Sequence, residues 1–250
     1  PRVHILSEPF PMSVLARLCR PEVVQPEVDA LVTRLFDWML VEVSSRELRC
    51  EAIASPTRMK AAHAEAIYAG EAIARGQRVV IVDVARAGIL PAHRFYQGLH
   101  SVVAAENLRQ DHIVASRMTD ADDRVIGVSL DGSKIGGPVT DATVMIPDPM
   151  AATGSSISGV IRHYMAADGG RPCKIVAVHL IATPEYLATV TREFPELEVY
   201  AIRLDRGLSP EDVLATRPGA RWSEERGLNE RQYIVPGAGG VGEVLNNAWV

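Results

Sequence analysis

One short stretch, in which an apolar strand runs into a small-residue loop and then a helix, constrains the fold of this chain most. Residues 144–146 are apolar enough for a buried strand, and helical spacing of apolar residues follows the loop until a Gly-Gly pair at 169–170. The loop itself is Asp-Pro-Met-Ala-Ala-Thr-Gly-Ser-Ser, residues 148–156. Amides at a helix start are unpaired and lie at the positive end of the helix dipole, so this loop favours a bound phosphate. An ordinary turn capped by Thr153 or Ser155 is the alternative.

The acid in front of this loop narrows the class of ligand. Residues 148–156 fit neither Gly-x-x-x-x-Gly-Lys-Ser/Thr nor Gly-x-Gly-x-x-Gly, so the loop gives no support to a nucleoside triphosphatase or a dinucleotide-binding protein. An acid five residues before Thr153 can accept hydrogen bonds from sugar hydroxyls while the amides hold a phosphate. We therefore interpret Asp148 and its loop as a site for a ribose phosphate.

Together with three other landmarks, this loop resembles the phosphoribosyl pyrophosphate (PRPP) motif of the uracil phosphoribosyltransferase family, whose usual form is Asp-Pro-Met-x-Ala-Thr-Gly-Gly-Ser. Pro149 narrows the match, because most other phosphoribosyltransferases have a second acid there. The other landmarks follow in the family's order: Arg-Ala-Gly at 86–88, Arg117, and Tyr-Ile-Val-Pro-Gly at 233–237. They span about residues 46–242, and the joint match is specific although each landmark alone is weak.

The resemblance implies a role for each landmark. Arg86 and Arg117 are expected to bind pyrophosphate, since a guanidinium stays charged and donates in a fork, and Asp148 is expected to bind the ribose hydroxyls. These three residues are the catalytic candidates. Gly88 is expected to let backbone amides approach the pyrophosphate, with a plain turn glycine as the alternative. The full PRPP-binding set is Arg86, Ala87, Gly88, Arg117, Asp148, Pro149, Met150, Ala151, Ala152, Thr153, Gly154, Ser155 and Ser156.

The C-terminal landmark resembles the family's uracil site, where main-chain groups read the edge of the base. The base-binding candidates are Tyr233, Ile234, Gly239, Gly240 and Val241.

The chain departs from the family just after this landmark. The family continues Leu-Gly-Asp-x-Gly-Asp-Arg, whereas this chain has Ala-Gly-Gly-Val-Gly-Glu-Val at 238–244. The first acid, which contacts PRPP in the family, is Gly240 here; the second is Glu243, and the Arg is Val244. The departure predicts weaker binding of metal or PRPP.

Alternation of apolar strands and helices predicts one α/β domain over residues 1–250, with a largely parallel sheet covered by helices on both faces. Residues 1–75 are predicted to be mainly helical, and residues 125–138 to form a flexible β-arm. The C-terminal part is expected to be a base-binding hood, and residues 209–226 are interpreted as an insertion or a passive surface excursion. Strands are expected near 79–84, 112–115, 125–130, 144–146, 174–181 and 198–203, with helices after Ala92, Thr153 and Pro184.

Composition limits the possible partners. A net charge of -5 and a pI near 5.8 argue against a nucleic-acid surface, and no apolar run reaches the length of a membrane span. Three widely spaced cysteines suggest neither a disulfide framework nor a metal site, which favours a cytoplasmic protein with no structural metal.

By resemblance, the expected function is that of a glycosyltransferase of pyrimidine salvage that transfers phosphoribosyl from PRPP to uracil and yields UMP and pyrophosphate. Mg²⁺ is expected as cofactor, bound mainly through PRPP, and a homo-oligomer as the assembly. Two alternatives stay open: a phosphoribosyltransferase for a modified pyrimidine base, and a non-catalytic regulator that binds PRPP or UMP.

Overall fold

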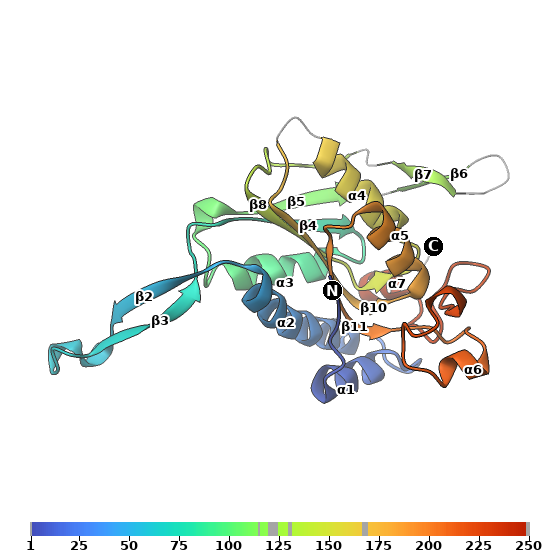
Figure 1. Ribbon diagram of the computed structural model, residues 1–250, viewed down its shortest axis with the longest axis horizontal. Coiled ribbons are helices and arrows are strands. Elements are labelled where there is room, and N and C mark those ends of the chain that lie inside the picture. Colours follow the sequence, from blue (N-terminus) through green and yellow to red (C-terminus); the bar gives the residue numbers. More distant parts are fainter. Residues whose placement is uncertain (1, 115, 120–124, 130–131, 167–169, 249–250) are drawn as a thin grey trace.

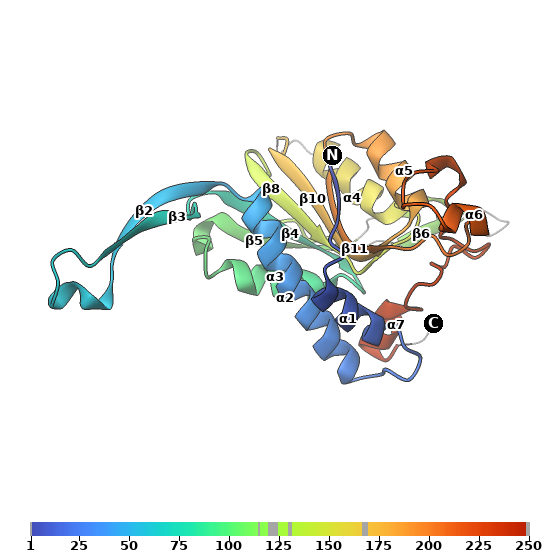
Figure 2. The ribbon, with the colours of Figure 1, turned by 60° about the horizontal axis from the view of Figure 1, so that its bottom comes forward.

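A parallel sheet forms the centre of the protein, and helices cover both of its faces (Figures 1 and 2). The computed structural model describes residues 2–114, 116–119, 125–129, 132–166 and 170–248. Every strand pair of the central sheet in that part of the chain is parallel. In spatial order the strands are β1 (Val3–Ile5), β11 (Glu198–Leu204), β10 (Lys174–Ala182), β8 (Ala142–Pro147), β4 (Arg78–Ala85) and β5 (Leu108–Val114), with the short β9 (Met150–Ala151) beside β10.

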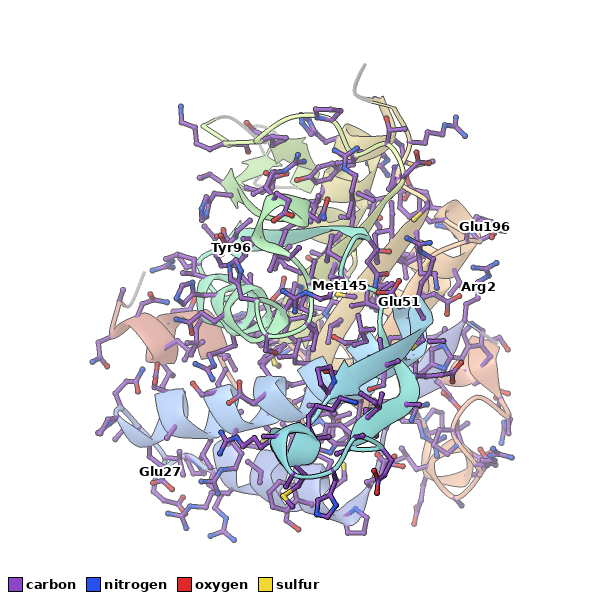
Figure 3. The ribbon with its side chains drawn as sticks, turned by 90° about the vertical axis from the view of Figure 1, so that its left-hand side faces the viewer. Arg2, Glu27, Glu51, Tyr96, Met145 and Glu196 are labelled. Atoms are coloured by element: carbon purple, nitrogen blue, oxygen red, sulfur yellow. The ribbon has the colours of Figure 1, made fainter. Side chains whose placement is uncertain are left out.

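Successive residues of the central strands serve opposite layers. In β4, Val79 and Ile81 belong to one core cluster with apolar residues of the first three helices, whereas Val80 and Val82 belong to a second cluster with the next two. Figure 3 shows Met145 of β8 in the centre of the molecule. Because both faces are covered, the inner strands such as β4, β8 and β10 are mainly apolar rather than alternating. The helices are α1 (Pro9–Leu18), α2 (Glu27–Glu47) and α3 (Ile89–Leu99) in one layer, and α4 (Ser155–Ala166) and α5 (Pro184–Glu193) in the other.

The structure confirms the predicted fold class, and each predicted strand of the parallel sheet and each predicted helix lies within a few residues of its expected place. The arm predicted over residues 125–138 has other bounds in the structure. β7 (Val125–Ser129) pairs as an antiparallel hairpin with β6 (Ser116–Thr119), which precedes the predicted range, whereas Lys134 forms a bridge with His112 of β5. Ala115, Leu130, Asp131 and Gly169, which those predictions include, lie outside the described residues.

The prediction that residues 1–75 are mainly helical is wrong beyond α2. β2 (Cys50–Pro56) and β3 (Ile67–Ile73) pair as a second antiparallel hairpin, which projects from the body of the molecule (Figures 1 and 2). Pro56 and Gly70 disfavour a helix interior, and the chain leaves α2 at Leu48 in an extended conformation. In Figure 3 this hairpin faces the viewer, with Glu51 on β2.

Residues 209–226, interpreted as an insertion, fold around the buried guanidinium of Arg206. It donates to the carbonyl oxygens of Val213 (2.9 Å), Leu214 (3.3 Å) and Thr216, and it pairs with the buried carboxylate of Glu225 at 3.2 Å. The segment contains the short helix α6 (Glu211–Leu214) and a 3₁₀ turn at Trp222–Glu224. The last helix of the chain is α7 (Val241–Asn246). No helix in the described ranges has the length and apolar character that a bilayer span requires.

Replacement of Arg206 tests whether this segment depends on the buried ion pair. Arg206→Met leaves Glu225 buried without its partner, so we expect the free energy of unfolding to fall by about 3 kcal/mol. Chemical denaturation measures the loss. The matched control is Arg221→Met in the same segment, whose partners Asp212 and Glu224 are exposed, and its effect should be much smaller. Equal losses in the two variants would contradict the prediction.

Candidate active site

The carboxyl ends of the central strands open into a cleft of about 630 Å³. Ligand sites of open parallel sheets form at this edge, because the loops that follow neighbouring strands meet there. Three segments far apart in the sequence line the cleft: the loop after β4, the loop after β8 and the C-terminal segment. The lining residues are 85–87, Val114, Asp148, Met150, Ala152, 231–234 and 239–243.

The loop after β4, residues 86–88, is the arginine loop. The exposed Arg86 donates from Nη1 to the carbonyl oxygen of Ala248 at 3.2 Å. The amide of Gly88 donates to Val84 at 3.0 Å, and a Cβ atom at Gly88 would lie 2.8 Å from backbone atoms of Val84 and 3.2 Å from the carbonyl of Pro147. Glycine is therefore required here for packing of the loop on β4 and β8. The expected role of Gly88, to let backbone amides approach the pyrophosphate, stays a prediction.

The loop after β8, residues 148–156, carries the sequence that resembles the PRPP motif, and we call it the PRPP loop after that resemblance. It surrounds a second cavity of about 80 Å³ next to the cleft. Asp148 borders both spaces. Helix α4 begins at Ser155, so the amides of its first turn are unpaired in the helix, as the sequence predicted. Gly154 precedes it with a φ of 88°, a backbone conformation that favours glycine. This geometry suits a phosphate bound at the helix start.

The buried side chain of His179 holds the PRPP loop in place through a hydrogen bond. His179 on β10 lies 2.7 Å from the carbonyl oxygen of Asp148 through Nδ1 and 2.7 Å from the hydroxyl of Tyr186 through Nε2. Burial lowers the pKa of His179 to about 4, so the ring is neutral at pH 7. Nδ1–H then donates to Asp148, and Nε2 accepts from Tyr186. Thr183 adds a bond from its hydroxyl to the carbonyl of Ala152 at 2.6 Å.

The position of Asp148 changes the pKa of its carboxyl group. Burial raises its pKa to about 7, and a weak hydrogen bond from the Met150 amide at 3.5 Å opposes this only in part. The free protein at neutral pH therefore holds Asp148 partly protonated. Sugar hydroxyls that donate to the carboxylate favour its charged form, so binding of such a ligand is expected to release a proton.

The C-terminal segment that faces the PRPP loop is held by buried side chains. Asp205 accepts from the amide of Gly237 at 2.7 Å and pairs with Arg203, which also donates to the carbonyl of Gly237 at 3.2 Å. Glu185, at the start of α5, accepts from the amide of Gly227 at 3.0 Å. These contacts fix the C-terminal segment to helix α5 and to β11, a strand of the central sheet.

Within this segment, Ile234 offers the main-chain groups expected of a base site. The main-chain groups on either side of it already form hydrogen bonds. The carbonyl oxygen of Tyr233 accepts from the amide of Asn229 at 3.0 Å, and the amide of Val235 donates to the carbonyl oxygen of Gly227 at 2.8 Å. The N–H and C=O of Ile234 make no hydrogen bond within the described part of the chain, and Ile234 lines the cleft. An adjacent donor and acceptor are thus available to a planar ligand.

Tyr233, Ile234, Gly239, Gly240 and Val241, the predicted base-binding residues, all line the cleft. So do Arg231 and Gln232, which the sequence analysis did not select although they directly precede Tyr233. Residues 237–242 also spell Gly-x-Gly-x-x-Gly. They follow a turn outside the parallel sheet rather than one of its strands, so they lack the strand–loop–helix context of a dinucleotide site.

Of the predicted catalytic residues, the structure brings Arg86 and Asp148 to one cleft. Arg117 lies on β6, opposite Val128 of β7, in the hairpin that follows β5. Its predicted contact with pyrophosphate stays a prediction, as do the predicted roles of the other site residues.

A parallel sheet whose strand ends carry an arginine loop and an acid-led phosphate loop defines an α/β protein of the phosphoribosyltransferase type. The family model "Uracil phosphoribosyltransferase" matches residues 6–220, and the chain belongs to that family. The matched range includes both loops and ends before Arg231 and the base-binding candidates.

Similar proteins are found among archaea. A uracil phosphoribosyltransferase of Pyrobaculum arsenaticum is 31% identical over 66% of this chain and 64% of its own length. One of Thermococcus gammatolerans is 29% identical over 67% of this chain and 61% of its own. The aligned chain thus spans less than two thirds of these relatives. A solved structure of an Aquifex aeolicus protein matches with a TM-score of 0.73 over 99% of each chain at 20% identity, which shows a shared fold.

Replacement of Asp148 tests the cost of its burial. Because its folded pKa of about 7 exceeds the ordinary value of 3.8, the folded state binds more protons than the unfolded state between these values, and stability falls as the pH rises through this range. Asp148→Asn removes this loss. From pH 5 to pH 8 we expect the variant to gain on the order of 2 kcal/mol in unfolding free energy relative to the wild type.

Denaturant titrations at both pH values measure this difference, and Asp141→Asn, which removes an exposed carboxyl outside the cleft, is the control. Parallel pH profiles of the wild type and Asp148→Asn would refute the prediction.

Proposed function

We propose that this protein transfers the phosphoribosyl group of PRPP to uracil and releases UMP and pyrophosphate, as a glycosyltransferase of pyrimidine salvage. The observation that carries the proposal is one cleft lined by the arginine loop, the PRPP loop and the C-terminal segment. A transfer of this kind needs a site for the diphosphate, one for the ribose phosphate and one for the base, next to one another.

In the proposed reaction, the bond from ribose C1 to the diphosphate oxygen breaks, and its electron pair leaves with pyrophosphate. N1 of uracil bonds to C1 and loses its proton to water. Positive charge develops on the sugar and negative charge on the leaving group, so fixed charges at each place stabilise the transition state. Asp148 holds the ribose hydroxyls, the amides at the start of α4 hold the 5-phosphate, and Arg86 with Arg117 holds the pyrophosphate.

The contact of Arg86 with Ala248 suggests how the diphosphate enters. The guanidinium donates to a neutral carbonyl in the free protein. A diphosphate offers charged oxygens, to which hydrogen bonds from a guanidinium are stronger. Binding therefore exchanges one acceptor for the other and draws Arg86 toward the ligand.

The donor set of the cleft fits Mg²⁺ that arrives on PRPP. Asp148 and Glu243 supply hard carboxylate oxygens along its wall, without a closed protein cage. Mg²⁺ that arrives with PRPP would supply positive charge to offset the charge of the leaving group. Among the described residues, the group with the spacing of a metal site is His4, Glu47 and Glu198 at the other end of the sheet. Its carboxylates already pair with Lys174 at 2.8 Å and with Arg2 at 3.0 Å.

Selection of the base is assigned to Ile234. Uracil presents alternating carbonyl and N–H groups on one edge, which match the N–H and C=O of one residue. A base with another pattern leaves these groups unpaired, at a cost of about 1–3 kcal/mol for each buried group.

Homo-oligomerisation is proposed on the projecting hairpin of β2 and β3. A two-stranded hairpin is marginally stable alone. This one carries exposed Met59, Ile67 and Tyr68, which a second copy of the chain can cover. We place the enzyme in the cytoplasm, because Cys19, Cys50 and Cys173 are all free thiols. The net charge of -5 fits small substrates better than nucleic acid.

Product analysis tests the proposed function. The protein is incubated with PRPP, Mg²⁺ and uracil, and UMP is separated and counted. We expect turnover that requires Mg²⁺, and a drop of about 10²–10³ in kcat/KM for Arg86→Ala, because a donor to the leaving group is lost. The control is Arg192→Ala, an exposed arginine near the end of α5.

The other outcomes identify the alternatives. Nucleotide formed only from 5-substituted uracils indicates a modified pyrimidine as substrate. UMP binding in calorimetry without turnover of any base indicates a regulator. Either result excludes uracil transfer as the function.

A further inference from the structure

Gly240 is a glycine that its own backbone does not require. Its φ of -80° and ψ of 78° are open to other residues, unlike the positive φ of its neighbour Gly239. Instead, a side chain at position 240 would meet the side chain of Glu243. A Cβ atom at Gly240 would overlap Oε2 of Glu243 and lie 2.9 Å from its Cδ. The carboxylate of Glu243 thus occupies the volume that a side chain at position 240 would fill.

This carboxylate lies in the cleft without a protein partner. Glu243 is half-buried and lines the same space as Arg86 and Asp148. In the described part of the chain its side chain makes no hydrogen bond and no ion pair. A carboxylate that lines a ligand cleft without a cationic partner of its own is available to a cation that enters with the ligand.

Two contacts place Glu243 at the diphosphate end of the cleft. Helix α7 begins against the arginine loop, since a Cβ atom at Gly242 would lie 3.4 Å from the Cβ of Ala87. The end of the same segment is tied to that loop through Arg86 and Ala248. A carboxylate next to a bound diphosphate repels it. A divalent cation placed between the two groups attracts both of them.

We propose that Glu243 binds the hydrated divalent cation that accompanies the diphosphate of the sugar substrate, and that Gly240 leaves the space in which its carboxylate does so. The inference rests on the proposed function and adds a residue to it. Of the two acids that the family carries at positions 240 and 243, this chain keeps the second as Glu243, and its side chain lies over the glycine that replaces the first. The acid that is kept thereby takes over the contact of the acid that is missing.

Binding measurements test this inference independently of turnover. The affinity for PRPP is measured by calorimetry at several Mg²⁺ concentrations for the wild type, Glu243→Gln and the control Glu230→Gln, which removes an exposed carboxyl outside the cleft. We expect Glu243→Gln to weaken PRPP binding about tenfold at saturating Mg²⁺, the loss of one cation contact worth about 1.4 kcal/mol, and to flatten the dependence on Mg²⁺. Glu230→Gln should match the wild type.

An exchange of the acid between the two positions makes the test sharper. Gly240→Ala displaces the carboxylate and should weaken Mg²⁺-dependent binding as Glu243→Gln does. The double variant Gly240→Asp/Glu243→Gln returns a carboxylate to the same space and should regain most of it. Circular dichroism confirms that each variant is folded.

The inference is overturned if Glu243→Gln binds PRPP like the wild type at every Mg²⁺ concentration. It is also overturned if the loss is equal with and without Mg²⁺, which would assign Glu243 to the base or the sugar. A wild type that binds PRPP through Mg²⁺ and Glu243 but forms no UMP refutes the proposed function and leaves this inference intact.

Discussion

The hydrogen bond from His179 to the carbonyl oxygen of Asp148 is the contact on which the rest of the site depends. The carbonyl of Pro149 accepts from the amides of Leu180 and Ile181 on β10, but that of Asp148 has no main-chain donor among the described residues, and an unpaired buried carbonyl is costly. β10 supplies the missing donor from its interior. Since Tyr186 holds the other ring nitrogen, α5 is joined to the same loop, and the ribose and phosphate ends of the loop are positioned by one element pair.

Burial also disfavours the charged form of the Asp148 carboxyl group as long as no ligand is bound. With a pKa raised to about 7, its charge is opposed by the free protein and favoured by donors from a sugar. Under the proposed function, sugar hydroxyls would stabilise the charged form of Asp148, whereas a phosphate without them gains nothing from this group. The stability that the buried acid costs would then be the counterpart of that preference.

The sequence predicted the parallel sheet and the place of the loops after β4 and β8 because these depend on local patterns: apolar strands, a glycine before a helix, and the order of the landmarks. It did not predict contacts between distant side chains. His179 stands in an apolar strand, and a polar residue there signals a buried partner without naming it. The hairpin of β2 and β3 was missed because its residues are exposed on both faces and show no apolar period. The sequence showed one acid lost at Gly240 and one kept at Glu243, but it did not show that the side chain of Glu243 lies over Gly240.

The two walls of the cleft are built differently, and this difference bears on substrate choice. The wall of β4, β8 and β10 is fixed by sheet pairing, and the family model matches it. The other wall, from Arg231 to Glu243, is held through a few side-chain contacts such as that of Asp205 with Gly237, and it lies beyond the matched range. Changes there alter the contacts with the base and the cation without a change in the sheet. Under the proposed function, chemistry at the sugar would be preserved while the base changes, and the choice of pyrimidine would be decided by the C-terminal segment.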